Sequence, residues 1–293
     1  MVESEDRSYE APDGSRLPMR VWRAAEGAGA LVYLHGIQSH SGWYEASSRR
    51  LAEEAGVSVY QIERRGSGTD TAHERGHVTR AAVWLQDVAA AAEVARRETG
   101  ARRVHLMGVS WGGKLALACA RHRPDLYRSL ILGAPGIIPQ VDLPFGRKVR
   151  IGWCVAVGRA LERFEVPLAD PHLFTENPER IRYIAEDPLS LHEVTARFLF
   201  ESRRLDRLAR RAARSVRLPT LLVLAEHDRI IDNEATRALL AGMPADRLKI
   251  IVHRGGHHTL EFDPDPEGYF SGLVRWVRQV ERSPGAQGFP ESG

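Results

Sequence analysis

The chain has 293 residues, with 41 Lys and Arg against 38 Asp and Glu, so its net charge is only +3. This near balance argues against a nucleic-acid-binding protein, and two cysteines, Cys119 and Cys154, suggest neither a disulfide framework nor a metal site. The polar N-terminus resembles no signal peptide and no apolar run is long enough to cross a membrane, so we expect a cytoplasmic protein.

The chain alternates between strand and helix patterns. Buried-type apolar runs and helical periodicity predict the first elements: a hairpin over residues 8–23, strands over 31–34 and 57–62, and helices over 43–55 and 81–99. The same patterns predict strands over 104–107, 129–133, 220–224 and 248–252, and helices over 114–122, 233–240 and 267–281. This alternation predicts an α/β fold with a mainly parallel central sheet flanked by helices.

The alternation stops in the middle of the chain. Residues 135–217 begin with Pro and Gly and continue with Arg, Glu and Ala at helical spacing. We interpret them as a helical cap inserted over the C-terminal edge of the sheet, where open α/β sheets bind ligands. Residues 1–134 and 218–282 then form the core, and residues 283–293, rich in Gly and Pro, are predicted to be a disordered tail.

A short motif indicates the chemistry. Gly108-Val109-Ser110-Trp111-Gly112 stands between a predicted strand and a predicted helix. A serine on such a sharp turn needs small residues two positions before and after it, and its hydroxyl is then exposed above the sheet. Ser110 is therefore a candidate nucleophile.

Acyl transfer also needs a base, a carboxylate that orients it, and amides for the oxyanion. Loops after two later strands carry the candidates: Glu226, Asp228 and Asp232 in the first, His257 and His258 in the second. The candidate oxyanion-hole donors are the backbone amides of Ile37, after His35-Gly36, and of Trp111.

These motifs resemble the α/β-hydrolase-fold serine hydrolases of the monoacylglycerol lipase and lysophospholipase-like branch, the serine aminopeptidase S33 type. His35-Gly36-Ile37-Gln38-Ser39-His40-Ser41-Gly42-Trp43-Tyr44 and Glu63-Arg64-Arg65-Gly66-Ser67-Gly68 match two of its loops. The resemblance covers residues 8–134 and 218–281 and implies the order Ser110, Asp228, His258 for the catalytic residues. It favours Asp228 by the spacing Asp-x-x-Ile, and His258 over the alternative His257 because a leucine follows two residues later.

The predicted function is hydrolysis of a carboxylic ester, of a lipid or monoacylglycerol type, without a cofactor or metal. Acyl transfer and thioester hydrolysis on the same residues are alternatives, and a non-catalytic ligand-binding receptor is a third.

A basic segment extends from Arg203 to Arg217 and holds seven arginines and one aspartate. It is typical of a solvated helix face, although it could also contact an anionic membrane surface or an acidic substrate group. The sequence predicts no oligomeric state.

Overall fold

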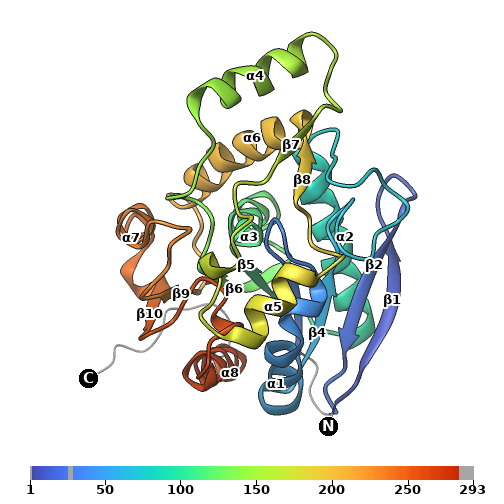
Figure 1. The fold of residues 1–293 in the computed structure, drawn as a ribbon. Helices are drawn as coiled ribbons and strands as arrows, with labels where there is room; N and C mark the ends of the chain where they lie inside the picture. The colour runs from blue at the N-terminus through green and yellow to red at the C-terminus, as the bar shows by residue number, and fades with distance from the viewer. Residues whose placement is uncertain (1, 26–28, 284–293) are drawn as a thin grey trace.

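A mixed eight-stranded sheet runs through the centre of the protein (Figure 1). The computed structural model describes residues 2–25 and 29–283, so all but the first residue of the predicted disordered tail lie outside the described residues. The strand order is β1-β2-β4-β3-β5-β6-β9-β10. Only β1, β2 and β4 pair antiparallel, and every other pair is parallel, which confirms the mainly parallel sheet.

The strands of this sheet are β1 (Ser4–Glu10), β2 (Arg16–Trp22), β3 (Gly29–Leu34), β4 (Val57–Ile62), β5 (Val104–Val109), β6 (Tyr127–Gly133), β9 (Thr220–Ala225) and β10 (Leu248–His253). The central strands β4, β5 and β9 are buried along their whole length, whereas the edge strands β1 and β10 are partly exposed. The apolar runs of the central strands show no alternation of buried and exposed residues, because helices cover both faces of the sheet.

Four long helices form the two outer layers. On one face α1 (Glu45–Ala55) packs against α8 (Glu267–Arg282), and on the other α2 (Ala81–Thr99) packs against α3 (Trp111–His122) (Figure 1). The shorter α7 (Asn233–Leu240) connects β9 to β10. Short 3-10 helices lie at η1 (Ser41–Tyr44), η2 (Pro171–Leu173), η3 (Ala245–Arg247) and η4 (Leu260–Phe262).

The chain between β6 and β9 forms a cap above the sheet. It contains α4 (Phe145–Ala156), β7 (Arg163–Glu165), α5 (Pro178–Glu186), β8 (Glu193–Thr195) and α6 (Ala196–Ala212). Helix α6 packs on α3 and α4 packs on α6, so the cap lies over the end of β5 (Figure 1). The predicted helical cap is therefore present. The antiparallel pair β7–β8 was not predicted, because three residues are too few to show a period.

Two helix ends differ from the prediction. Helix α3 begins at Trp111 rather than at residue 114, because the helix starts directly after the turn at Ser110. Helix α6 ends at Ala212, so Arg214 and Arg217 lie beyond the helix and not on its face. The chain must leave the helical conformation before Pro219, since the residue before a proline disfavours it.

Candidate active site

Ser110 occupies the turn between β5 and α3 with a backbone geometry that non-glycine residues rarely adopt. Its φ is 50° and its ψ is −124°. A Cβ added to Gly108 would lie 2.2 Å from the carbonyl oxygen of Gly112, and one added to Gly112 would lie 2.4 Å from the carbonyl oxygen of Leu34. A side chain at either position would clash with backbone atoms, which cannot move aside, so both positions require glycine. Such a strained position costs on the order of 1–3 kcal/mol and persists only because the surrounding structure enforces it.

A continuous chain of hydrogen bonds joins Ser110 to residues far away in the sequence. The Ser110 hydroxyl lies 2.9 Å from Nε2 of His258, and Nδ1 of the same ring lies 2.9 Å from Oδ2 of Asp228. Oδ1 of Asp228 accepts the backbone N–H groups of Ile230 and Ile231 at 2.8 and 3.0 Å. These amides hold the carboxylate in place, and the carboxylate in turn orients the imidazole toward the serine.

The other candidates have different partners. His257 Nδ1 lies 3.0 Å from Asp263, away from Ser110. Glu226 accepts the N–H of Gly255, and Asp232 accepts the N–H of Ala235 and so caps the start of α7. Asp263, the partner of His257, does not lie at the surface. Its carboxylate is buried, and this burial raises its pKa against the opposing effect of its hydrogen bonds to His257.

The loop after β3 comes close to Ser110. A Cβ on Gly36 would lie 3.3 Å from Cβ of Ser110, so only glycine permits this approach without a shift. The next residue, Ile37, and Trp111 both line the cavity that Ser110 faces. The backbone amides that are the oxyanion-hole candidates therefore belong to residues that line the same cavity as Ser110.

Arg64 holds this loop in position, a role that the sequence did not reveal. Its guanidinium donates to the carbonyl oxygens of Gly36 and Ile37 at 2.8 and 2.7 Å and lies 4.7 Å from the ring centre of Trp111. Burial lowers the pKa of Arg64, and the neighbouring Glu63 opposes that effect. Beside it, His35 is buried and accepts the N–H of Arg64. Burial and the charge of Arg64 lower the pKa of His35.

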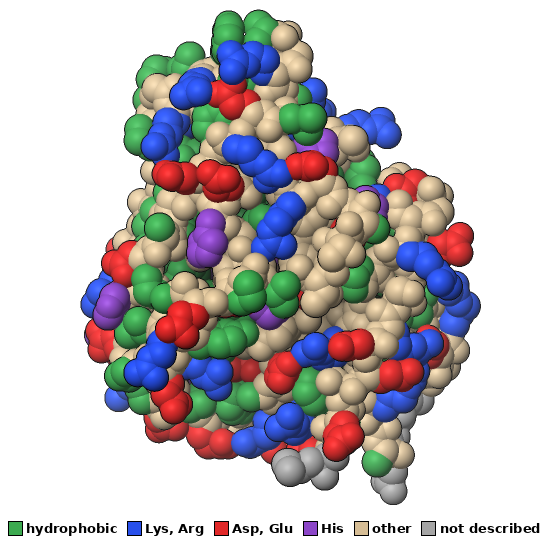
Figure 2. Space-filling model, turned by 45° about the vertical axis from the view of Figure 1, so that its right-hand side comes forward, with side chains coloured by type: hydrophobic (Ala, Val, Ile, Leu, Met, Phe, Trp, Pro, Cys, Tyr) green, Lys and Arg blue, Asp and Glu red, His purple; other side chains and the backbone are tan. Residues whose placement is uncertain are grey.

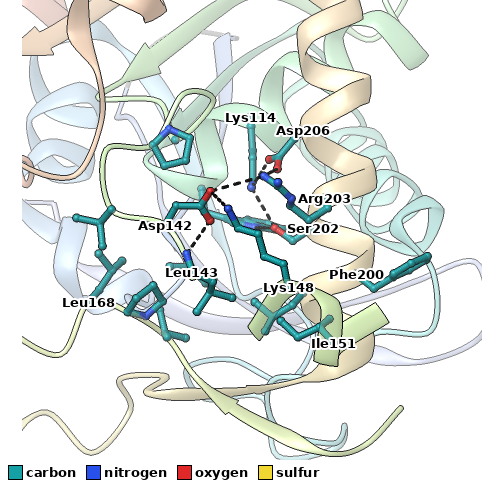
Figure 3. Close-up of a pocket in the computed structure, with 18 of the residues that line it drawn as sticks. Lys114, Asp142, Leu143, Lys148, Ile151, Leu168, Phe200, Ser202, Arg203 and Asp206 are labelled. Carbon is teal, nitrogen blue, oxygen red and sulfur yellow. Dashed lines mark hydrogen bonds and ion pairs between the residues drawn. The ribbon is translucent and has the colours of Figure 1, made fainter. Parts of the chain in front are cut away.

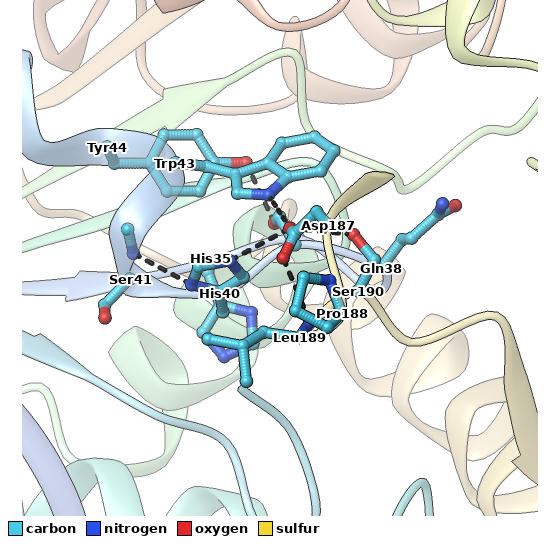
Figure 4. Close-up of polar contacts among 12 residues, drawn as sticks. His35, Gln38, His40, Ser41, Trp43, Tyr44, Asp187, Pro188, Leu189 and Ser190 are labelled. Atoms are coloured by element: carbon cyan, nitrogen blue, oxygen red, sulfur yellow. Dashed lines mark hydrogen bonds and ion pairs between the residues drawn. The ribbon is translucent and has the colours of Figure 1, made fainter. Parts of the chain in front are cut away.

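A second polar cluster ties the cap to the same loop (Figure 4). Asp187, which follows α5, lies 3.0 Å from Nε2 of His40 and accepts the indole N–H of Trp43 at 2.7 Å. Ser190 donates to the same carboxylate at 3.0 Å. Although burial opposes the shift, these hydrogen bonds hold the pKa of Asp187 well below its ordinary value. The cap and the loop that begins at His35 are thereby linked through one buried carboxylate.

A cavity of about 360 Å³ extends from Ser110 between the core and the cap (Figure 3). Its apolar lining comes from both parts of the chain: Ile37, Trp111, Val141, Leu143, Ile151, Val166, Leu168, Leu199, Ile230 and Ile231. The indole of Trp111 also donates to Ser202 of α6 and stacks on Phe198, so the ring both lines the cavity and packs beneath the cap. A cavity of this size, largely apolar with few polar groups, is typical of a small-molecule site.

One wall of the cavity is charged. Lys114 is buried, donates to Ser202 at 3.0 Å and pairs with Asp206 at 2.6 Å. Burial lowers the pKa of Lys114, while Asp206 partly restores it. Within residues 2–25 and 29–283, no group of three or more His, Cys, Asp or Glu side chains is placed to hold a metal ion. Nor does any helix in that part of the chain combine the length and the apolar character that a membrane span requires.

The strand order and the serine turn define the class of protein. Solved structures share this architecture: the monoacylglycerol lipase of Paleococcus ferrophilus aligns with a TM-score of 0.81 and 23% identity over 92% of this chain and 100% of its own. A soluble variant of the Saccharomyces cerevisiae monoglyceride lipase, in complex with a substrate analog, aligns with a TM-score of 0.80 and 17% identity over 96% of each chain. The chain has the α/β-hydrolase fold.

The sequence comparisons identify the family. The profile described as "Serine aminopeptidase, S33" matches residues 25–265. The Mycolicibacterium smegmatis monoacylglycerol lipase is 21% identical over 93% of this chain and 96% of its own length, and the human monoglyceride lipase is 24% identical over 95% and 92%. The chain belongs to the S33 family of α/β hydrolases, in its monoacylglycerol lipase-like branch, and is by class a carboxylic ester hydrolase. The predicted family is confirmed.

Proposed function

We propose that this protein hydrolyses a lipid-type carboxylic ester through an acyl-enzyme formed on Ser110. The observation that carries the proposal is the chain of hydrogen bonds from Ser110 through His258 to Asp228. The largely apolar cavity beside Ser110 suits an acyl chain, and the similar proteins named above are monoacylglycerol and monoglyceride lipases.

In the first half-reaction the hydroxyl oxygen of Ser110 attacks the ester carbonyl carbon and its proton passes to Nε2 of His258. Asp228 stabilises the imidazolium, and the N–H groups of Ile37 and Trp111 donate to the oxyanion. When the tetrahedral intermediate collapses, His258 returns the proton to the leaving alcohol oxygen. The products of this half-reaction are the free alcohol and the Ser110 ester.

In the second half-reaction water takes the place of the alcohol. His258 removes a proton from the water as its oxygen attacks the acyl carbon, and then protonates the Ser110 oxygen as the carboxylic acid leaves. An alcohol or a thiol in place of water would give acyl transfer, and a thioester would acylate Ser110 by the same steps.

Labelling with a fluorophosphonate probe, followed by peptide mapping, tests the nucleophile without presupposing the substrate. We expect modification of Ser110 in the wild type and its loss in Ser110→Ala and His258→Ala. His257→Ala is the matched control, since it removes a neighbouring imidazole that has a different partner, and it should still be labelled.

Turnover of oleoylglycerol should fall by about 10⁴-fold or more in Ser110→Ala and His258→Ala. Undiminished turnover in Ser110→Ala would overturn the assignment of the nucleophile. Tight binding of the lipid by folded wild-type protein, with neither turnover nor labelling, would instead support the receptor alternative. Formation of a new ester with added alcohol would support acyl transfer.

We also propose peripheral contact of the cap with an anionic membrane. Figure 2 shows basic and hydrophobic side chains next to one another over the α4 end of the molecule. Phe145 and Trp153 of α4 are 81% and 52% exposed, and Arg203 and Arg207 of α6 are also exposed. Sedimentation with phosphatidylserine vesicles but not with phosphatidylcholine vesicles is the expected result, and equal behaviour toward both would contradict the electrostatic part.

A further inference from the structure

The charged wall of the cavity is built from five side chains that are distant in sequence. Figure 3 shows the charged ends of Lys114, Asp142, Lys148, Arg203 and Asp206 turned toward one another. Nζ of Lys148 lies 2.5 Å from Asp142. Arg203 lies between the two carboxylates, 4.0 Å from Asp142 and 3.7 Å from Asp206, and Asp206 in turn pairs with Lys114. The core helix α3 and the cap elements therefore meet here at a network of charges, in addition to the apolar contact between Trp111 and Phe198.

The cations of this wall outnumber the anions. Arg204 and Arg207 also line the cavity, which gives five cationic side chains against the two carboxylates, although Arg204 is paired with Glu201, which lies outside the lining. Each carboxylate is already shared between two cations. Arg207 forms no hydrogen bond or ion pair with any residue that the structure describes. Arg203 and Arg207 are exposed, so their charge is not balanced within the wall and is accessible to an anion that enters the cavity.

The wall is also close to the reacting group. Lys114 lies in the first turn of α3, which begins directly after Ser110, and both residues line the same cavity. Its ammonium group is buried in a cavity whose remaining lining is mostly apolar. A neutral acyl chain gains nothing from a buried ammonium group, whereas an anion on the same molecule as the ester can pair with it. Arg203 can add a bidentate contact, since its guanidinium matches a carboxylate or a phosphate.

We propose that this wall binds an anionic group of the substrate, so that the preferred ester carries a carboxylate or a phosphate within reach of Lys114 and Arg203. The inference rests on the proposed ester hydrolysis at Ser110 and specifies its substrate class. Two sources share this chemistry: the half-ester of a dicarboxylic acid, and an acylglycerol that bears a phosphate. The anionic group pairs with Lys114 and Arg203, while the apolar part of the molecule lies along the rest of the cavity.

The test compares matched esters. p-Nitrophenyl hexanoate and the p-nitrophenyl half-ester of adipic acid have the same chain length and leaving group and differ by one terminal carboxylate. Oleoylglycerol and oleoylglycerol phosphate form the second pair. We expect the wild type to show at least about tenfold higher kcat/KM for the anionic member of one pair, with a preference that decreases as salt is added. A carboxylate preference indicates the dicarboxylic source, and a phosphate preference indicates the phospholipid source. Equal rates, or faster cleavage of the neutral member in both pairs, would overturn the proposal.

Variants locate the preference on the wall. Arg203→Gln should lower the ratio of anionic to neutral kcat/KM by about tenfold or more, as expected for a hydrogen bond to a charged group. Arg210→Gln is the matched control because it removes the same charge from the same helix at an exposed position outside the cavity lining, and its ratio should equal that of the wild type. Equal ratios in both variants and the wild type would show that the wall only holds the cap in place.

A binding measurement separates this inference from the proposed function. Titration of Ser110→Ala with adipate, with hexanoate as its neutral-ended counterpart, needs no turnover. Tighter binding of adipate that Arg203→Gln weakens would support the anion site even if no ester is cleaved. Turnover of neutral esters with no preference for adipate would overturn the anion site and leave the hydrolase proposal intact.

Discussion

The buried carboxyl group of Glu261 should make the stability of this protein depend on pH in an unusual direction. Glu261 lies in η4, three residues after His258, and reaches across to the first turn of α1. Its carboxyl oxygens accept the backbone N–H of Ser47 at 3.0 Å and the hydroxyl of the same residue. Glu261 is 7% exposed, and this burial raises its pKa from an ordinary 4.5 to about 7, although the contacts with Ser47 oppose the shift.

The direction of the pH dependence is set by the state, folded or unfolded, in which Glu261 binds its proton more tightly. Because the pKa is higher in the folded protein, folding is favoured while the group is protonated in both states, below about pH 4.5. That contribution is lost as the pH rises through about 7. The rise in pKa corresponds to at most about 3.4 kcal/mol in the free energy of unfolding. About 2.5 kcal/mol of this contribution is lost between pH 5 and pH 8.

Urea unfolding of the wild type and Glu261→Gln at pH 5, 6, 7 and 8 measures this contribution. Glutamine can keep both contacts with Ser47 without a charge. From pH 5 to pH 8 the free energy of unfolding of the variant should therefore fall by about 2.5 kcal/mol less than that of the wild type. Glu10→Gln, on the exposed edge strand β1, is the control and should follow the wild type. Parallel pH profiles for the wild type and Glu261→Gln would refute the reasoning, since Glu261 would then titrate alike in the folded and unfolded chains.

Three further predictions test the serine turn, the packing of the cap on the core and the loop after β3. Gly112→Ala places a Cβ 2.4 Å from the carbonyl oxygen at the end of β3 and should lower the thermal midpoint strongly, while Gly146→Ala, with open space around it, should stabilise by about 0.4–1 kcal/mol. Phe198→Ala removes a fully buried ring that packs on two tryptophans and should cost about 3–5 kcal/mol in urea unfolding, whereas Phe200→Ala, 36% exposed, should cost much less. Arg64→Gln removes the donors that hold the loop after β3, which carries the proposed oxyanion donor Ile37, and should lower kcat about tenfold with a smaller change in KM. An unchanged kcat in folded Arg64→Gln would show that the loop holds its geometry alone.

Local patterns in the sequence were sufficient for most of the fold. Helix α2 has the predicted bounds because nineteen residues repeat the helical period, and the central strands were recognisable as short apolar runs. The Gly-x-Ser-x-Gly spacing indicated a strained turn because the steric need for Gly108 arises against Gly112, only four residues later in the chain. These features depend on contacts over a few residues, so the sequence by itself determined them.

Contacts between distant segments were decided only by the tertiary structure. His257 and His258 are adjacent and chemically identical, and resemblance to a family favoured one of them, but only the path of the loop after β10 directs one ring to Ser110 and the other to Asp263. The burial of Asp263, the grip of Arg64 on the loop after β3 and the charged wall around Lys114 have no local signature. The contacts of Asp263 and Arg64 form within the core and the charged wall forms where the cap packs on the core, and periodicity along the chain carries no information about which neighbours a side chain will meet in the folded protein.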